Sequence, residues 1–419
     1  MNHFFFKRNL NKKSEYKILS PLSLIIFSFI ARTVSVIIYG DTIIYNEWAI
    51  LLNNLIDFKA YSFYTFENQL IPSAYMPPLY AFLLYFLKII SFDLINLIFL
   101  IFLIQIILST ISVYIFYQIN KNFFSNKISV GIAFVFSFFP LHLYSVGQTS
   151  SITLQIFLSL LFIKYFFLIY KDESKKNIII FSIISGLLLL TRGEFLLILI
   201  FSLIYIFIFK KNFFPQILKI LLITAIVISP YLIRNYIHFN EIFLIKSKGY
   251  NLWKGNNSKA GVEGYFYKFE EFKNLQSQLD TLKKDKYYEI NRDDLFFKEA
   301  LSNISNNPDI YLKLFLKKII SFYFIDLNST YPNYYHYLNI IPILLISFLS
   351  FPGILFFLKK KEFFISNYLI IYLFSNLIIF SIFFILPRSK LVILPIQIIL
   401  ASYIVIYLYE KLLKTKNNK

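Results

Sequence analysis

The stretch GDTIIYNEWA, residues 40–49, places two carboxylates, Asp41 and Glu47, directly after the first long apolar run of the chain. Carboxylates are costly beside a bilayer, because lipid cannot replace the water that stabilises their charge. Their interpretation therefore depends on whether the preceding run crosses a membrane and on what else lies on the same side of it.

Apolar runs recur throughout the sequence. Hydrophobic residues make up 58% of the 419 residues, and each run of about 20 of them is long enough to cross a hydrocarbon core of roughly 30 Å. The pattern predicts an all-α polytopic membrane protein. We expect ten spans, at residues 19–38, 94–119, 128–144, 151–170, 178–191, 193–209, 217–236, 339–358, 364–386 and 391–410.

The stretch PPLYAFLLYFLKIIS, residues 77–91, does not fit this count. It covers only about 22 Å at 1.5 Å per residue, and counting it as a span would place lysine clusters on both sides of the membrane. We expect a half-inserted or interfacial helix that begins at Pro77 and Pro78. As a full span it would bring the total to eleven or twelve.

The net charge of +19 comes mainly from clusters of cations between the apolar runs and at the two ends of the chain. A nucleic-acid-binding protein would gather its cations on one surface, whereas short clusters between spans follow the positive-inside rule. We therefore expect a multi-pass protein of the cell inner (cytoplasmic) membrane with both termini in the cytoplasm, and no nucleic-acid partner. The clusters are Lys7, Arg8, Lys12, Lys13 and Lys17; Lys171, Lys175 and Lys176; Lys210 and Lys211; Lys359, Lys360 and Lys361; and Lys411, Lys414, Lys416 and Lys419.

The spans divide the chain into three modules. Residues 1–236 form an N-terminal transmembrane module with a first outer loop at 39–93. Residues 237–338 form a large outer (periplasmic) loop subdomain, and residues 339–419 form the C-terminal transmembrane helices and a basic cytoplasmic tail. Within the large loop, residues 262–300 alternate charged and aromatic residues at roughly helical spacing, which predicts a helical cap over the site.

The first outer loop contains an amphipathic segment, YNEWAILLNNLI at residues 45–56. Its apolar residues share one helical face, which predicts a helix lying in the membrane interface. Glu47 falls on the opposite, polar face. Asp41 precedes this helix and is well suited to be its N-cap, and a catalytic carboxylate is the alternative interpretation.

Several short segments, taken in order, carry a family resemblance. In the first loop Asp41, Tyr45 and Ala49 follow one another at intervals of four residues, and PPLY (77–80) comes later. The further segments are LLLLTRGEFLL (187–197), SPYLIRNYIHFN (229–240), GYNLWKGNN (249–257), NNPDIYLKLFLKK (306–318) and PRSKLVILP (387–395). Together they resemble the GT-C glycosyltransferases, in particular bacterial relatives of the dolichyl-phosphate-mannose protein mannosyltransferases and of the lipid A aminoarabinose transferases. The resemblance implies a GT-C-like bundle of about 10–12 transmembrane helices with a helical outer-face loop subdomain.

The resemblance also implies a reaction. A sugar would move, with inversion, from a polyprenyl-phosphate donor to a lipid, glycan or protein acceptor on the outer face. Asp41 would take the acceptor proton as general base. Tyr45 would line the substrate site or anchor the interface, and Glu47 would either contact the acceptor or remain a solvated residue.

Cations are needed to hold the departing phosphate, and Arg suits this role because its planar fork donates two parallel hydrogen bonds. Arg388, with Lys390 in the same turn, is the preferred phosphate ligand, and Arg192 and Arg234 are further candidates, although such side chains also reach out to lipid headgroups. Trp253 and Asn256 would contact the sugar, or else be a packed Trp and an ordinary turn.

The chain departs from the family pattern at two places. Met76 stands where the family often has Arg before Pro-Pro, and SVGQTSSITLQIF (145–157) lacks a second acidic residue. The four His residues are scattered and there is no Cys, so the sequence predicts no zinc site. A carboxylate-bound Mg²⁺ or Mn²⁺ stays open, with Asp41 as its one good ligand candidate.

Two other functions share some of these features. An O-antigen polymerase or ligase also has many spans and a large outer loop, but it would depend on loop arginines more than on a carboxylate after the first span. A flippase or transporter of lipid-linked sugars would bury charges mid-span and would need no large outer loop. Both remain alternatives at the level of the sequence.

Overall fold

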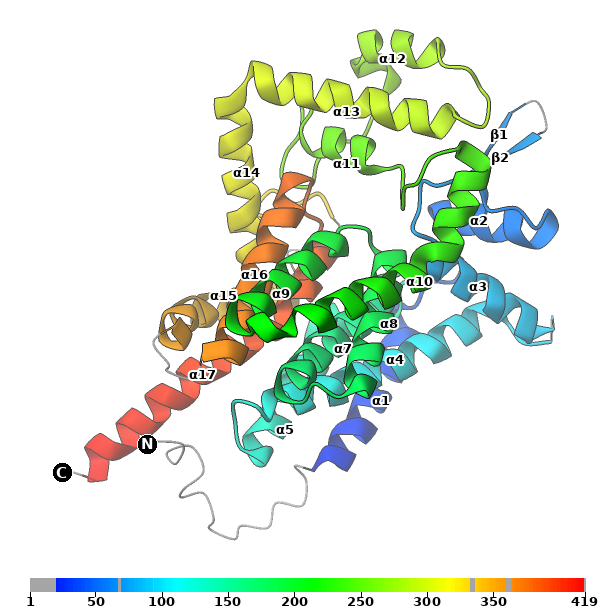
Figure 1. Cartoon of the computed structure of the whole chain (residues 1–419). Helices are drawn as coiled ribbons and strands as arrows, with labels where there is room; N and C mark the ends of the chain where they lie inside the picture. The colour runs from blue at the N-terminus through cyan, green and yellow to red at the C-terminus, as the bar shows by residue number, and fades with distance from the viewer. Residues whose placement is uncertain (1–19, 67–68, 93, 332–335, 359–362, 418–419) are drawn as a thin grey trace.

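The computed structural model of the chain describes residues 20–66, 69–92, 94–331, 336–358 and 363–417. Helices form a bundle, and a smaller helical layer made of α11, α12 and α13 covers one end of it (Figure 1). The predicted basic cluster at residues 7–17, Lys359–Lys361 and Lys419 lie outside the described residues.

The bundle helices follow the predicted spans closely. They are α1 (Pro21–Tyr39), α4 (Leu97–Asn120), α5 (Asn126–Ser137), α6 (Pro140–Val146), α7 (Ile152–Lys171), α8 (Lys175–Thr191), α9 (Phe195–Phe209), α10 (Phe214–Phe239), α15 (Tyr337–Leu358), α16 (Phe363–Ile382) and α17 (Lys390–Asn417), with 3-10 turns η1 (Lys211–Phe213) and η3 (Pro387–Ser389). In the described part of the chain, seven helices are long and apolar enough to cross a membrane. The predicted all-α polytopic membrane architecture is confirmed, although α8 and α9 are short, with 17 and 15 residues.

The third predicted span, 128–144, is not one straight helix. It breaks into α5 and α6, which are bent by 61° relative to each other. Pro140 begins α6 and supplies the physical reason, because proline lacks the N–H that a continuous helix needs and its ring clashes with the preceding turn. After the break, the C-terminal end of α6 at Gly147 lies beside Asp41 of the first outer loop.

The first outer loop contains a helix at the amphipathic segment, as predicted, and an unexpected hairpin. Helix α2 (Asn46–Asp57) buries its apolar face, and α3 (Pro78–Ser91) covers the stretch that is too short to span. Between them β1 (Ser62–Phe66) pairs antiparallel with β2 (Gln69–Pro72). The aromatic run in β1 favours a strand, but its short length hides that signal among the many aromatic residues of the chain.

The outer layer has its own small core. It consists of α11 (Lys248–Gly255), α12 (Lys273–Asp280) and α13 (Tyr288–Asn306), and α14 (Pro308–Tyr323) leads back to the bundle (Figure 1). Trp253 and Phe296 lie at the centre of this core. Within the predicted helical stretch 262–300, helices form at residues 273–280 and from 288 onward, whereas residues 262–272 are irregular apart from a 3-10 turn (Phe269–Glu271, η2).

Burial differs strongly between the first and last bundle helices. Only 22% of the most apolar window in α1 is buried, against 72% in α17, so α1 lies at the rim of the bundle and α17 inside it. Arg32 in α1 is nevertheless fully buried, and it donates to Ser109 Oγ at 2.7 Å and to the Ser28 carbonyl at 3.0 Å. Its guanidinium also contacts Ser137 Oγ of α5 at 3.2 Å and His142 Nδ1 of α6 at 3.3 Å, one on each side of the α5–α6 break, which stabilises the bend.

Candidate active site

Asp41 lies against the connection between α6 and α7. Its Oδ2 accepts hydrogen bonds from the Thr149 backbone N–H at 2.7 Å and from Thr149 Oγ1 at 3.0 Å. Its own N–H donates to the Gly147 carbonyl at 2.8 Å. A side chain at Gly147 would come within 3.1 Å of the Gly40 Cα, so the two glycines allow this close approach.

The interpretation of Asp41 as the N-cap of the interfacial helix is wrong. Tyr45 occupies the N-cap position of α2, and no side chain caps that end. The Asp41 carboxylate is held from the other side by Thr149, which leaves Oδ1 without a hydrogen bond from the described part of the chain. One oxygen fixed by two donors and one oxygen open is a suitable arrangement for a group that accepts a proton from a substrate.

Polar groups inside the bundle support this loop from below. Gln105 in α4 donates from Nε2 to the carbonyls of Val146 and Gln148, at 2.7 and 3.0 Å. Tyr80 in α3 donates to the Gln105 Oε1 at 3.3 Å, and its ring packs edge-on against Trp48 of α2 at 4.9 Å between centroids. The first loop, α3 and the α6–α7 connection are thus held as one unit around Asp41.

Glu47 lies in the first turn of α2 and faces the outer layer. Its charge acts on Lys254 in α11 and on Arg388 in η3, so all three lie within electrostatic range of one another. Tyr45, by contrast, is 46% exposed. The structure therefore brings Glu47 toward the cations rather than leaving it as an isolated solvated residue.

Two arginines on different segments approach the same place. Arg388 is exposed, lies within electrostatic range of Arg192, and makes no hydrogen bond or ion pair with the described residues. Arg192, at the C-terminal end of α8, is 3.9 Å from Glu194, and its Nε is buried without a hydrogen-bond partner. Like charges that gather without a hydrogen-bonded anion indicate a place where an anionic ligand would bind.

Lys254 is a third cation in this group, and it is not among the residues selected from the sequence. It is only 5% exposed, and its Nζ lies 3.6 Å from the centre of the Phe266 ring and 4.0 Å from that of Phe384. Burial, assisted by the charge of Arg388, lowers the Lys254 pKa to about 8. The available signal was its place in LWKGNN, between the Trp and the Gly-Asn-Asn turn.

The segment after Lys254 is anchored to the end of α16. A side chain at Gly255 would meet the Phe383 carbonyl at 1.9 Å, so only glycine fits. Lys318 of α14 is buried and donates from Nζ to the carbonyls of Gly255 and Phe383, at 2.7 and 2.6 Å, while burial lowers its pKa to about 7. Asn256 adds a hydrogen bond to the Ile382 carbonyl at 2.9 Å. These contacts hold α11, and with it Lys254, beside η3.

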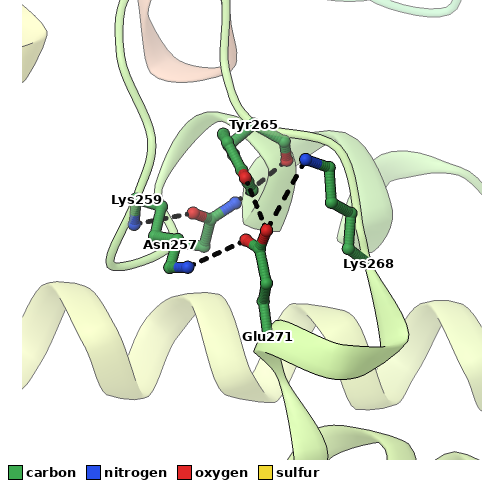
Figure 2. Close-up of polar contacts among 5 residues, drawn as sticks. All are labelled: Asn257, Lys259, Tyr265, Lys268 and Glu271. Atoms are coloured by element: carbon green, nitrogen blue, oxygen red, sulfur yellow. Dashed lines mark hydrogen bonds and ion pairs between the residues drawn. The ribbon is translucent and has the colours of Figure 1, made fainter.

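The loop that follows α11 is closed by a small polar network (Figure 2). Glu271 accepts from Lys259 Nζ at 2.9 Å and from Tyr265 OH at 3.0 Å, and these two hydrogen bonds lower its pKa to about 2. The Tyr265 N–H donates to the Lys254 carbonyl at 2.8 Å. The network fixes residues 257–271 and so places Phe266 over the Lys254 ammonium group.

Four of the residues selected from the sequence are occupied within the protein. Arg234 donates to the carbonyls of Ser73 and Tyr61, at 2.6 and 3.0 Å. Lys390 donates to the three carbonyls at the end of α14, residues 322–324, and Trp253 is only 1% exposed. The Asn256 amide is bonded to Leu252, Ile382 and Lys318. We therefore assign these four residues to holding the site together rather than to contacting substrate.

A metal site does not emerge from the described residues, in which no three His, Asp or Glu side chains gather. Asp41 has Thr149 as its neighbour, and the α6–α7 connection offers no second carboxylate. The residues present do not form the oxygen-rich ligand set that Mg²⁺ or Mn²⁺ requires, and we derive no step through a metal ion.

Comparison with solved structures identifies the architecture. The oligosaccharyltransferase of Archaeoglobus fulgidus in its apo form matches with a TM-score of 0.57 and 14% identity, over 97% of this chain and 52% of that one. ArnT from Cupriavidus metallidurans, bound to undecaprenyl phosphate, matches with a TM-score of 0.52 and 11% identity, over 91% of this chain and 59% of that one. Both are GT-C glycosyltransferases. The chain has a GT-C-like fold.

The likeness lies in the fold and not in the overall sequence. Neither the models of protein families nor the curated proteins contain a match to this chain. The chain spans between half and three fifths of the length of the GT-C structures it matches. The same Archaeoglobus enzyme tethered to an acceptor peptide matches equally well, with a TM-score of 0.57 and 13% identity over 95% of this chain and 51% of that one.

Proposed function

We propose that this chain is an inverting glycosyltransferase that moves a sugar from a polyprenyl-phosphate donor to an acceptor hydroxyl of a lipid, glycan or protein. The observation that carries the proposal is the open carboxylate oxygen on Asp41, whose other oxygen is held by Thr149. Two cations, Arg388 and Lys254, lie within electrostatic range of Glu47 in the same loop and support it. The GT-C-like fold supports the same class, because its structural neighbours include an oligosaccharyltransferase and a protein crystallised with undecaprenyl phosphate.

In the proposed reaction Asp41 acts as the general base. The acceptor hydroxyl passes its proton to Oδ1 while its oxygen bonds to the anomeric carbon, and the bond from that carbon to the phosphate oxygen breaks with its electrons going to the phosphate. Thr149 keeps the carboxylate oriented through Oδ2. A positioned base of this kind contributes about 10²- to 10⁴-fold.

The cations take the departing phosphate. Arg388 has its whole guanidinium available and would donate two parallel hydrogen bonds. Lys254, with a pKa of about 8, is mostly protonated at pH 7 and adds a point charge in surroundings that exclude water. Their positive charge stabilises the negative charge that develops on the phosphate in the transition state. Glu47, within range of both, would contact the acceptor or the sugar.

The lysines at the far end of the bundle support a location of the site on the outer face. Lys171 ends α7, Lys175 begins α8, and Lys210 and Lys211 follow α9. These helix ends lie at the end of the bundle opposite to α11–α13 (Figure 1). We infer that this end is cytoplasmic, with both termini, and that the site faces outward. Because the chain has no Cys, single cysteines at residues 176 and 270 test this: a membrane-impermeant thiol reagent added to whole cells should label only the second.

The deciding experiment uses the purified full chain, a radiolabelled polyprenyl-phosphate sugar and candidate acceptors. Asp41→Asn should lower transfer by about 10²- to 10⁴-fold without changing the elution profile. Asp57→Asn is the matched control, because Asp57 lies in the same loop, exposed at the C-terminal end of α2. This variant should retain activity. Equal activity of the Asp41 variant and the wild type would refute the base assignment. Lipid translocation in vesicles without any sugar transfer would support the flippase alternative.

A further inference from the structure

A cavity of about 240 Å³ opens between α4 and α7, at the end of the bundle opposite to the candidate active site. Its polar lining consists of three lysines and two amides, and an apolar wall is formed by Phe167, Leu168 and Ile119. The polar residues are Lys121, Lys164, Lys171, Gln118 and Asn122.

The three lysines have no carboxylate partner in the described part of the chain. Lys171 donates to the Asn122 Oδ1 at 2.6 Å, and the ammonium groups of Lys121 and Lys164 lie near tyrosine rings, at 5.7 and 5.6 Å from the ring centres. Acidic residues nearby are used elsewhere: Glu173 forms an ion pair with Lys210 at 2.9 Å. Three positive charges therefore line one cavity without an internal anion.

Lys164 lies too deep in α7 to serve only to set the orientation of the helix in the membrane. It lies seven residues before Lys171 in α7, which puts it about 10 Å further from the helix end at 1.5 Å per residue. A lysine inside a membrane-spanning helix is costly unless it faces water or an anion. Lysines that only mark the cytoplasmic side belong at helix ends, so Lys164 requires a different explanation.

We propose that this cavity binds the headgroup of an anionic phospholipid. The lysines would hold the phosphodiester, and the apolar wall would contact the glycerol and the first carbons of the acyl chains. The Gln118 Oε1 is buried without a hydrogen-bond partner, and a carbonyl oxygen in that state needs a donor. A headgroup hydroxyl supplies one, which favours a phosphatidylglycerol-type headgroup over phosphatidic acid. Basic pockets between membrane helices are known to recognise such lipids.

The test measures lipid retained by the purified full chain in non-ionic detergent, by native mass spectrometry, after incubation with phosphatidylglycerol, phosphatidic acid or phosphatidylcholine. Phosphatidylglycerol should be retained most. The Lys164→Gln, Lys171→Gln double variant should lower its retention about tenfold or more. Lys175→Gln, Lys176→Gln removes the same charge from exposed positions at the start of α8 and should change it by less than twofold.

Three outcomes would overturn the proposal. The first is an equal loss of phosphatidylglycerol retention in the two double variants, and the second is equal retention of phosphatidylglycerol and phosphatidylcholine. The third is displacement of the lipid by millimolar inorganic phosphate, which would make this a small-anion site. Lys121→Gln, at the exposed rim, should weaken retention even if the deeper variant proves unstable, and its failure to do so counts against the site equally. None of these results depends on whether the chain transfers sugar.

Discussion

Two regions at the end of the bundle that carries α11–α13 contain the same kinds of charged residue and use them differently. Around Arg234, every charge is matched: its guanidinium bonds to two loop carbonyls, and Glu289 of α13 accepts from Ser73 Oγ and the Ala74 N–H, at 2.6 and 2.7 Å. We call this region the loop clamp. Around Lys254 and Arg388, the cations have no hydrogen-bonded anion among the described residues.

Residue type therefore does not separate the two regions, whereas hydrogen-bond satisfaction does. A buried or crowded charge without a partner carries a free-energy cost that proteins seldom keep without a functional reason. The neighbours Arg388 and Lys390 illustrate this within one turn. Lys390 binds the carbonyls that end α14, while Arg388 binds nothing in the described chain.

The largest effect is expected at Arg388. Arg388→Gln should lower sugar transfer by about 10²- to 10³-fold, the loss seen when one donor to a developing oxyanion is removed, with little change in melting temperature. Lys390→Met, two residues away, should do the reverse, because it removes the buried ammonium that donates to the carbonyls of residues 322–324, of which only that of Tyr323 keeps other side-chain donors. Steady-state transfer and thermal unfolding in detergent, measured on both variants, separate the roles. Similar melting losses in both would remove the contrast between the two cations.

The loop clamp should respond in stability. Glu289→Ala leaves the buried Ala74 N–H and Ser73 hydroxyl without their acceptor, and each such loss costs about 1–3 kcal/mol. We expect a lower melting temperature and activity per folded molecule within a few-fold of the wild type. Glu299→Ala on the same helix, outside the clamp, is the control. An unchanged melting temperature would show that the clamp does not hold the loop.

The titration of Lys254 should make sugar transfer depend on pH. Its pKa of about 8 lies below the usual lysine value of 10.5. The kcat/KM for the donor should therefore fall as pH rises through about 8, because Lys254 loses its charge. Lys254→Arg keeps its charge over this range and should remove the decline. Stability should change in the opposite direction: between pH 8 and 10.5 the unfolded chain binds more protons at this residue, which raises folded stability with pH. A decline in kcat/KM that persists in Lys254→Arg would exclude Lys254 as its source.

Much of the fold follows from the sequence, because the apolar runs are long enough to mark the membrane helices. The lysine clusters between them predict on which side of the membrane each connection lies. What could not be predicted depends on contacts between distant segments. Thr149 holds Asp41 from 108 positions away, and the break at Pro140 that brings it there occurs inside a continuous apolar run. Lys254 looked like one cation among 42, since only the folded chain encloses it between Phe266 and Phe384.

Arg192 stands between the two regions, and it tests how sharply they differ. It is partly exposed and only loosely matched, at 3.9 Å from Glu194, so Arg192→Gln should raise KM for the donor by about two- to fivefold, the range of a weakly screened charge. Glu194→Gln leaves the arginine charged and freed from its acid, and should leave KM unchanged or lower it. If the ion pair between Arg192 and Glu194 instead stabilises the turn between α8 and α9, both variants would lower the melting temperature alike and KM would not distinguish them. A KM raised only by the loss of the arginine assigns it to the substrate phosphate, since the same ion pair is broken in both proteins.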